Sequence, residues 1–258
     1  MADLFDMHLR AQRRDRAARG NVELFLYERA FDDCLERLAL MQRRFERALL
    51  IGSPDPGWPT RLRSHSNEVD ARDPGRLFAD RTHGELLVED RWPPTEAAYD
   101  LALAIGTLDT VNALPLALRL IRHSLRSGGL FLGALSGGET LPQLRMAMRA
   151  ADAVSSGAAP HVHPRIEAAA LAPLLTDAGF VQAVVDVDRI PVSYGSLDRL
   201  VSDLRAMAAT SVLQSRARFI SRRALAAARR AFADAGDGAR TVETFEILHF
   251  AAWAANNG

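Results

Sequence analysis

Lysine is absent from the 258 residues, so arginine supplies all 32 basic side chains, balanced by 32 aspartates and glutamates. The formal net charge of zero favours neither nucleic acid nor a membrane surface as the main partner. Cysteine is almost absent too: the single Cys34 excludes internal disulfides and cysteine-rich zinc sites. Because Cys34 lies at helical spacing from Phe31, Leu35 and Leu38, we expect a buried helix position rather than a nucleophile.

Long hydrophobic runs are also missing. No segment approaches the ~20 apolar residues of a membrane-spanning helix, and the first residues lack the apolar segment of a secretory signal. We therefore expect a cytoplasmic protein with no membrane span. With 48% hydrophobic and 25% charged residues, the composition is that of an ordinary globular protein. The length suits one α/β domain with additions.

Hydrophobic spacing predicts helices first and then alternating strands and helices. Segment 1–46 is expected to be a helical N-terminal arm, with an arginine-rich helix in 4–19 and an apolar stripe from Leu24 to Phe45. Residues 47–258 are expected to form one α/β domain, with 196–235 as a helical insertion before the last strand. The predicted strands are 49–51, 67–70, 86–90, 99–106, 130–135, 180–190 and 244–253, with a turn at 127–129. This alternation indicates a mostly parallel, doubly wound sheet.

A glycine- and proline-rich turn, Gly52-Ser-Pro-Asp-Pro-Gly57, follows the first predicted strand. Its spacing is that of a dinucleotide-type turn in which Pro54 takes the place of the middle glycine. Proline adds a ring and removes an N–H donor where the backbone would approach a ligand. Two interpretations stay open: a cofactor loop, or a tight turn that binds nothing. A Walker-type loop is excluded, because it needs lysine where Trp58 stands.

Several longer stretches together resemble the class I S-adenosylmethionine-dependent methyltransferases. The similarity is greatest to the branch of the mitochondrial complex I assembly factor 5, a near relative of the malonyl-carrier-protein methyltransferases. The most specific stretch is Gly137-Gly-Glu-Thr-Leu-Pro-Gln-Leu-Arg145. Others are Leu4-Phe-Asp with the arginine-rich arm, Tyr99-Asp-Leu-Ala-Leu, Asn112-Ala-Leu-Pro-Leu, Pro160-His-Val-His-Pro164 and Val192-Ser-Tyr194.

The resemblance implies a Rossmann-like fold with a seven-stranded, mostly parallel sheet whose last strand is antiparallel. S-adenosylmethionine would lie across the ends of the first, second and fourth strands. By position, Asp70 would accept the ribose hydroxyls, and Asp90, with Glu89 beside it, would contact the adenine amine. The implied cofactor contacts are Gly52, Ser53, Asp55, Gly57, Asp70, Ala71, Glu89, Asp90, Ile105 and Gly106. The implied substrate-side residues are Asp109, Gly138, Glu139, Thr140, Arg145, His161 and His163, and no catalytic residue is assigned.

The leading hypothesis is therefore an S-adenosylmethionine-dependent methyltransferase-like enzyme acting on a protein or carrier-bound substrate. The reaction would be methyl transfer or, as the assembly-factor branch implies, arginine hydroxylation. The alternative is a cofactor-free pseudo-methyltransferase that serves as an assembly or scaffold protein. Pro54 motivates the alternative, as does Leu50, which stands where the family has an acid.

Two other functions are less well supported by the residues. The arginine-rich helices after residue 213 could bind nucleic acid, but the apolar residues interleaved with their arginines indicate an ordinary solvated face. A metal site is not expected, because His161 and His163 lack further ligands. The oligomeric state is left open.

Overall fold

The computed structural model describes residues 3–20, 23–155, 157–215 and 219–255. Two helices, α1 (Met7–Arg19) and α2 (Phe25–Leu40), precede the sheet. The apolar stripe predicted to run to Phe45 stops being helical at Leu40, and Phe45 instead opens the first strand with its side chain buried. Cys34 is buried in α2 as predicted, and burial raises the pKa of its thiol to about 12.

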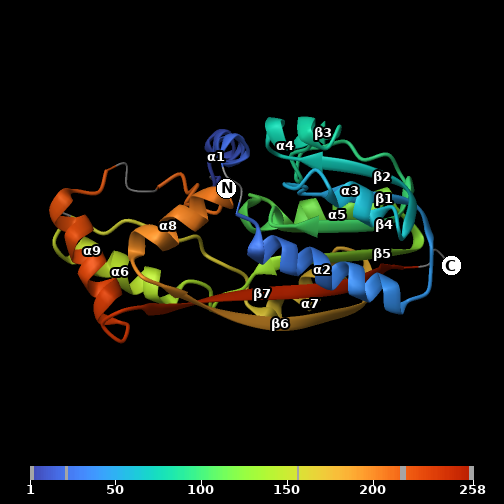
Figure 1. Ribbon diagram of the computed structural model, residues 1–258. Helices are drawn as coiled ribbons and strands as arrows, with labels where there is room; N and C mark the ends of the chain where they lie inside the picture. Colours follow the sequence, from blue (N-terminus) through green and yellow to red (C-terminus); the bar gives the residue numbers. More distant parts are fainter. Residues whose placement is uncertain (1–2, 21–22, 156, 216–218, 256–258) are drawn as a thin grey trace.

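Seven strands form one sheet in the order β3-β2-β1-β4-β5-β7-β6 (Figure 1). They are β1 (Phe45–Ile51), β2 (Ser66–Asp73), β3 (Glu85–Leu86), β4 (Tyr99–Ile105), β5 (Leu125–Ser136), β6 (Phe180–Tyr194) and β7 (Thr241–Ala254). The first five strands pair in parallel, whereas β7 runs antiparallel to both β5 and β6. The predicted seven-stranded, mostly parallel sheet with an antiparallel last strand is confirmed.

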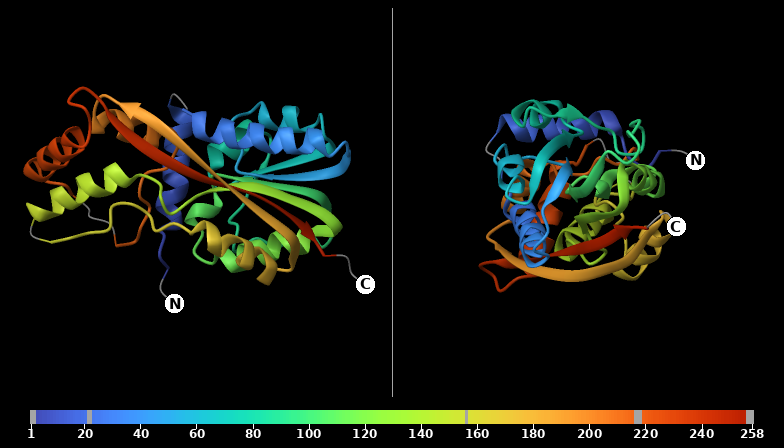
Figure 2. Two further views of the ribbon diagram at one scale, coloured as in Figure 1. Left: turned by 90° about the horizontal axis from the view of Figure 1, so that it is seen from below. Right: turned by 90° about the vertical axis from the view of Figure 1, so that its right-hand side faces the viewer.

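Helices cover both faces of this sheet (Figure 2). On one face lie α2 and α3 (Trp58–Leu62), where the Phe31 and Trp58 rings stack with centroids 4.3 Å apart. The other face is covered by α5 (Leu114–Ser124) and α7 (Ala168–Asp177). The central strands carry uninterrupted apolar runs, Ala48–Ile51 in β1 and Leu101–Ile105 in β4, because helices bury these residues from both sides. No helix in the described part of the chain is long and apolar enough to cross a membrane.

The long strands β6 and β7 reach past the parallel strands and lead to a helical lobe (Figure 1). This lobe consists of α6 (Pro142–Ala153), α8 (Leu197–Ala206) and α9 (Arg222–Asp234), with α6 packed on α9. In the chain, α8 and α9 come between β6 and β7, within the segment predicted to be helical. The lobe lies on the side where β1, β4 and β5 end, so it encloses that edge of the sheet.

The end of the second strand differs from the prediction. We expected this strand to stop at Asp70, but β2 continues to Asp73 because its pairing with β1 persists as far as Arg72, opposite Ile51. Near it, α4 (Arg76–Arg81) packs against α1 and β2. The extension changes which acid lies at the carboxyl end of β2.

Two further boundaries also differ. The third strand was expected over 86–90, but β3 contains only Glu85 and Leu86, so the acids that follow lie in a turn. The turn expected at 127–129 is instead a bulge within β5: Tyr99 pairs with Leu125 while Leu101 pairs with Leu130. The extra residues are accommodated without ending the strand.

Candidate functional site

The carboxyl ends of β1, β2 and β4 meet at one edge, where open α/β sheets bind ligands. Gly52, directly after β1, has φ +80°, and a Cβ there would lie 2.2 Å from the Ile105 carbonyl oxygen. Gly106, after β4, has φ +65°, and its Cβ would lie 2.5 Å from the Tyr27 ring of α2. Both turns require glycine, because the backbone has a left-handed conformation and because neighbouring atoms leave no room for a Cβ.

The loop after β1 is closed by its own side chains. The Asp55 carboxylate accepts a hydrogen bond of 2.6 Å from the Gly57 amide, as in an Asx turn. Ser53 is fully buried, and its amide donates to Asp73 Oδ2 at 3.1 Å. Pro54 lies between Ser53 and Asp55 in the chain, and as a proline it has no backbone N–H to donate. The loop therefore connects β1 to α3 and also contributes a donor to the strand-end acid.

Asp73, the acid at the end of β2, already accepts four hydrogen bonds. Arg14 of α1 donates to it through Nε at 2.7 Å and Nη2 at 2.5 Å, and the amides of Ser53 and Gly75 donate at 3.1 and 2.7 Å. The residue is 0% exposed. Burial alone would lower the pKa of Arg14, but the charge and hydrogen bonds of Asp73 outweigh it and raise the pKa. The bidentate arginine occupies the acceptor positions that a ribose diol would need.

Asp70, expected to be this acid, lies farther back along β2. It accepts hydrogen bonds of 2.8 Å from both Arg47 Nη2 and Tyr99 OH. Burial and the Asp70 hydrogen bond raise the pKa of Tyr99 to about 12. The strand-end position assigned to Asp70 is therefore corrected to Asp73, and Ala71, next to Asp70, is buried within β2. The sequence held a signal for this, because Asp73 directly precedes the Pro74-Gly75 turn.

Glu89, after β3, is held in the same way as Asp73. Arg10 donates to its two oxygens at 2.7 Å each and to the Thr107 carbonyl at 2.7 Å, and Glu89 is 0% exposed. Its neighbour Asp90 accepts from the Ala113 amide at 3.0 Å, while its Oδ1 has no hydrogen-bond partner. Because Arg10 and Arg14 are four residues apart, they lie on one face of α1. A single helix therefore binds both Asp73, at the end of β2, and Glu89, after β3.

The predicted substrate residues begin on the far side of Gly106. Asp109, in the short 3₁₀ helix η1 (Leu108–Thr110), accepts from the Ser136 amide at 2.8 Å. Arg165 Nη1 lies 3.5 Å from the Asp109 carboxylate. Asp109 therefore lies between the ends of β4 and β5, beside an arginine that the sequence did not suggest.

Residues 137–140, which follow β5, are hydrogen-bonded to β7. Thr140 Oγ1 donates to the Glu246 carbonyl at 2.9 Å, and the Glu139 amide donates to Glu246 Oε1 at 3.4 Å. A Cβ on Gly138 would lie 2.2 Å from Glu167 Oε1. These contacts fix the turn that leads into α6.

The loop that carries the two predicted histidines is fixed by hydrogen bonds to the lobe. Arg145 donates to the His163 carbonyl at 3.0 Å and to the Thr140 carbonyl at 3.2 Å. His163 Nε2 accepts from the Val212 amide at 2.7 Å, and His161 pairs with Asp152 at 2.8 Å. Arg145 thus bonds to backbone carbonyls. Within the described ranges, no three or more histidine, cysteine or acidic side chains come together in a possible metal site.

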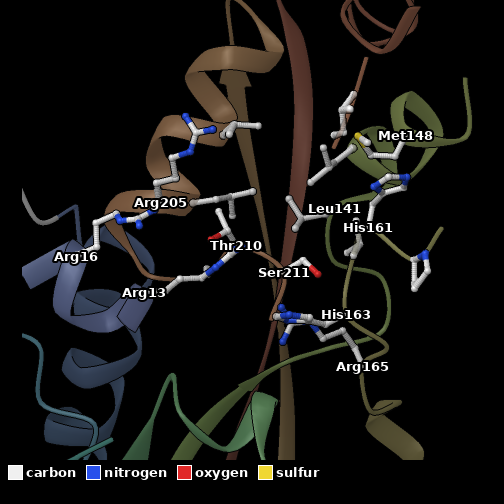
Figure 3. Close-up of a pocket in the computed structure, with 17 residues that line it drawn as sticks. Arg13, Arg16, Leu141, Met148, His161, His163, Arg165, Arg205, Thr210 and Ser211 are labelled. Atoms are coloured by element: carbon white, nitrogen blue, oxygen red, sulfur yellow. Dashed lines mark hydrogen bonds between the residues drawn. The ribbon is translucent and has the colours of Figure 1, made fainter. Parts of the chain in front are cut away.

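A cavity of about 350 Å³ lies between α1, α6, α8 and the 160–165 loop (Figure 3). The sequence identified His161 and His163 in its lining but missed Arg13, Arg165 and Arg205. These arginines come from segments distant in sequence, so no local spacing could group them. Two smaller cavities, of about 40 and 30 Å³, lie at the ends of β4 and β5 and share Arg165 with the larger one.

The cofactor edge fits an S-adenosyl group in residue type but not in its present hydrogen bonding. Glycine turns and strand-end carboxylates are placed as such a ligand requires. However, Asp73 and Glu89 are both bound by α1, and the small cavities at this edge fall far below the roughly 300–1,000 Å³ of typical ligand sites. A ligand could reach these carboxylates only if α1 released them.

Comparisons with known proteins agree with this architecture. No protein-family model matches the chain. The "Arginine-hydroxylase NDUFAF5, mitochondrial" of Danio rerio is 32% identical over 64% of this chain and 52% of its own length. The malonyl-[acyl-carrier protein] O-methyltransferase of Xylella fastidiosa is 32% identical over 63% of this chain and 54% of its own length. The chain thus spans about half the length of the curated relatives that it matches.

Solved structures show the same fold. A putative methyltransferase from Bacillus halodurans superposes with a TM-score of 0.57 at 9% identity, covering 87% of this chain and all of that one. The N-methyltransferase NodS from Bradyrhizobium japonicum, solved with S-adenosylhomocysteine, gives a TM-score of 0.53 at 14% identity, covering 95% and 98% of the two chains. The resemblance read from the sequence is confirmed: the chain is homologous to NDUFAF5 arginine hydroxylases and malonyl-carrier-protein methyltransferases and has the Rossmann-like class I methyltransferase fold.

Proposed function

We propose that this chain binds S-adenosylmethionine at the ends of β1, β2 and β4 and modifies a protein or carrier-bound substrate. The observation that supports this most is the gathering of Gly52, Asp73, Glu89 and Gly106 at one edge of the sheet. When bound, the cofactor would supply an activated methyl group. The two kinds of relative differ in reaction, and we favour methyl transfer because it needs only alignment and exclusion of water.

In this proposal Asp73 accepts the ribose hydroxyls and Glu89, with Asp90, faces the adenine. Both acids are bound by α1, so cofactor loading requires Arg14 and Arg10 to leave them. The cofactor would then shift α1 towards an arrangement in which the carboxylates are free. The size of this shift is set by the difference between its affinities for the two arrangements. The helix would thus act as a gate over the cofactor edge.

Calorimetric titration with S-adenosylhomocysteine tests the assignment. Asp73→Asn should weaken binding at least tenfold, whereas Asp70→Asn, a matched change on the same strand, should alter it less than twofold. Glu89→Gln gives a second measurement if Asp73→Asn folds poorly. Equal effects at Asp70 and Asp73 would contradict the assignment. Methyl transfer is then measured with labelled cofactor and an acylated carrier protein.

A cofactor-free scaffold is the second candidate. The saturation of Asp73 and Glu89 by buried arginines supports it, together with Pro54 in the loop after β1. Absence of S-adenosylhomocysteine binding up to millimolar concentration, in both the wild type and an Arg14 variant, would select this candidate. A cytoplasmic location, a role in complex I assembly and the lack of nucleic-acid binding stay predictions.

A further inference from the structure

Arginines surround the cavity of about 350 Å³ between α1 and the helical lobe. Arg13 and Arg16 reach it from α1, Arg205 from α8, and Arg165 from the loop after His163 (Figure 3). The described residues that line it include no aspartate or glutamate. The cavity therefore concentrates positive charge within a chain whose formal net charge is zero.

Two polar side chains at this cavity have hydrogen-bonding atoms that are buried without a partner. The Arg165 side chain is only 6% exposed, and its Nε and Nη1 have no hydrogen-bond partner. Its neighbouring carboxylate, Asp109, lies 3.5 Å away and is already bonded by the Ser136 amide and hydroxyl. Ser211 Oγ, also on the cavity wall, is likewise buried and unpaired. Buried groups without partners cost free energy that an acceptor in the cavity would recover.

The side chains nearby respond to this concentration of positive charge. Burial, together with the charges of Arg165, Arg13 and Arg145, lowers the pKa of His163 to about 3. Burial together with Arg165 and Arg149 also lowers the pKa of Arg145. His163 is therefore neutral near pH 7 and adds no positive charge to that of the arginines at the cavity.

The opposite wall of the cavity is apolar. It is formed by Leu141, Leu144 and Met148 at α6 and by Val201 and Leu204 of α8. Apolar walls with a few placed polar groups are typical of sites for small organic ligands. An inorganic anion would satisfy the arginines but leave this wall unused.

We propose that the cavity binds an amphipathic organic anion, a carboxylate or phosphate on an apolar chain. The anionic group bonds with Arg165 and Arg13, and the chain lies along the wall formed by α6 and α8, towards Arg205. Guanidinium groups recognise carboxylate and phosphate alike through paired N–H donors. The larger cavity shares Arg165 with the small cavities at the ends of β4 and β5, so it leads towards the proposed reaction edge. The identification of this anion as the substrate rests on the proposed function, whereas the proposal that the cavity binds it does not.

Calorimetry without cofactor tests this binding with four probes: octyl phosphate, octanoate, 1-octanol and inorganic phosphate. We expect one of the two amphipathic anions to bind at least tenfold more tightly than both 1-octanol and inorganic phosphate. The tighter of the two anions identifies the anionic group. Arg165→Gln and Arg13→Gln should each weaken that binding at least tenfold, and Arg199→Gln, an exposed arginine of α8 that does not line the cavity, should change it less than twofold.

Specific results would overturn the proposal. They are equal binding of 1-octanol, equal binding of inorganic phosphate, anion binding that survives both Arg165→Gln and Arg13→Gln, or no binding at millimolar concentration. If Arg165→Gln does not fold, Arg13→Gln decides, because Arg13 is only half-buried. Since no cofactor is present, failure of S-adenosylhomocysteine binding leaves this result intact, and the two proposals can fail separately.

Discussion

Replacing Arg14 with methionine tests whether α1 is docked as described. The Arg14 and Asp73 side chains are 5% and 0% exposed, so the substitution would leave a buried carboxylate with only two backbone donors. Breaking a buried ion pair from one side costs about 3–5 kcal/mol. For a chain of this size that loss lowers the melting temperature by roughly 6–20 °C.

Denaturant unfolding followed by circular dichroism measures the effect, and Arg47→Met provides a matched control. Arg47 also pairs with an aspartate, Asp70, but its side chain is 42% exposed, so its loss should cost less than about 1 kcal/mol. Adding Asp73→Asn to Arg14→Met should recover part of the lost stability, because it removes the unpaired charge. Equal small losses for Arg14→Met and Arg47→Met would refute the reasoning, since they would mean that α1 is not packed on the strand ends.

Three other predictions test the strand-end turns and the histidine loop. Gly52→Ala should lower the free energy of unfolding by roughly 2–5 kcal/mol, because its Cβ would lie 2.2 Å from the Ile105 carbonyl oxygen. Gly238→Ala, at φ +91° in open space, should lower it by only about 1 kcal/mol. Equal losses for the two variants in denaturant unfolding would contradict this. The pKa of His163 falls to about 3 on folding, so the unfolded chain takes up the proton first as the pH falls below about 6.5 and stability declines. Between pH 7 and pH 5, the loss of unfolding free energy should be about 2 kcal/mol smaller in His163→Gln, and an unchanged loss would contradict the burial of a neutral imidazole. Pro54→Gly should strengthen S-adenosylhomocysteine binding in calorimetry, and weaker binding would mean that the proline preorganises the loop.

The sheet could be predicted from the sequence because its central strands carry strong local signals. The runs Ala48–Ile51 and Leu101–Ile105 are apolar without interruption, as strands buried on both faces must be. The polar strand β2 lacks that signal, and both Asp70 and Asp73 suit the end of a strand. Only pairing with its neighbours extends β2: Arg72 pairs with Ile51 of β1, and Asp73 pairs with Leu86 of β3.

The chemistry of the site was less predictable, because it depends on contacts between distant segments. Arg10 and Arg14 belong to a run that the sequence predicted only as an arginine-rich helix, yet each binds an acid dozens of residues farther along the chain. Arg165 follows His161 and His163, and the resemblance implied the histidines, not the arginine, for the substrate side. The burial of Arg165 beside Asp109 depends on how the lobe folds over the strand ends. Sequence patterns locate the strand ends but not the partners that reach them.

The affinity of S-adenosylhomocysteine for Arg14→Met, relative to the wild type and Arg47→Met, tests the central claim most directly. With folding of each variant verified by circular dichroism, we predict that Arg14→Met binds at least tenfold more tightly than the wild type, because Asp73 becomes free to accept the ribose hydroxyls. Arg47→Met should bind like the wild type. Equal affinity of Arg14→Met and the wild type would contradict the claim that α1 competes with the cofactor for the acid at the end of β2.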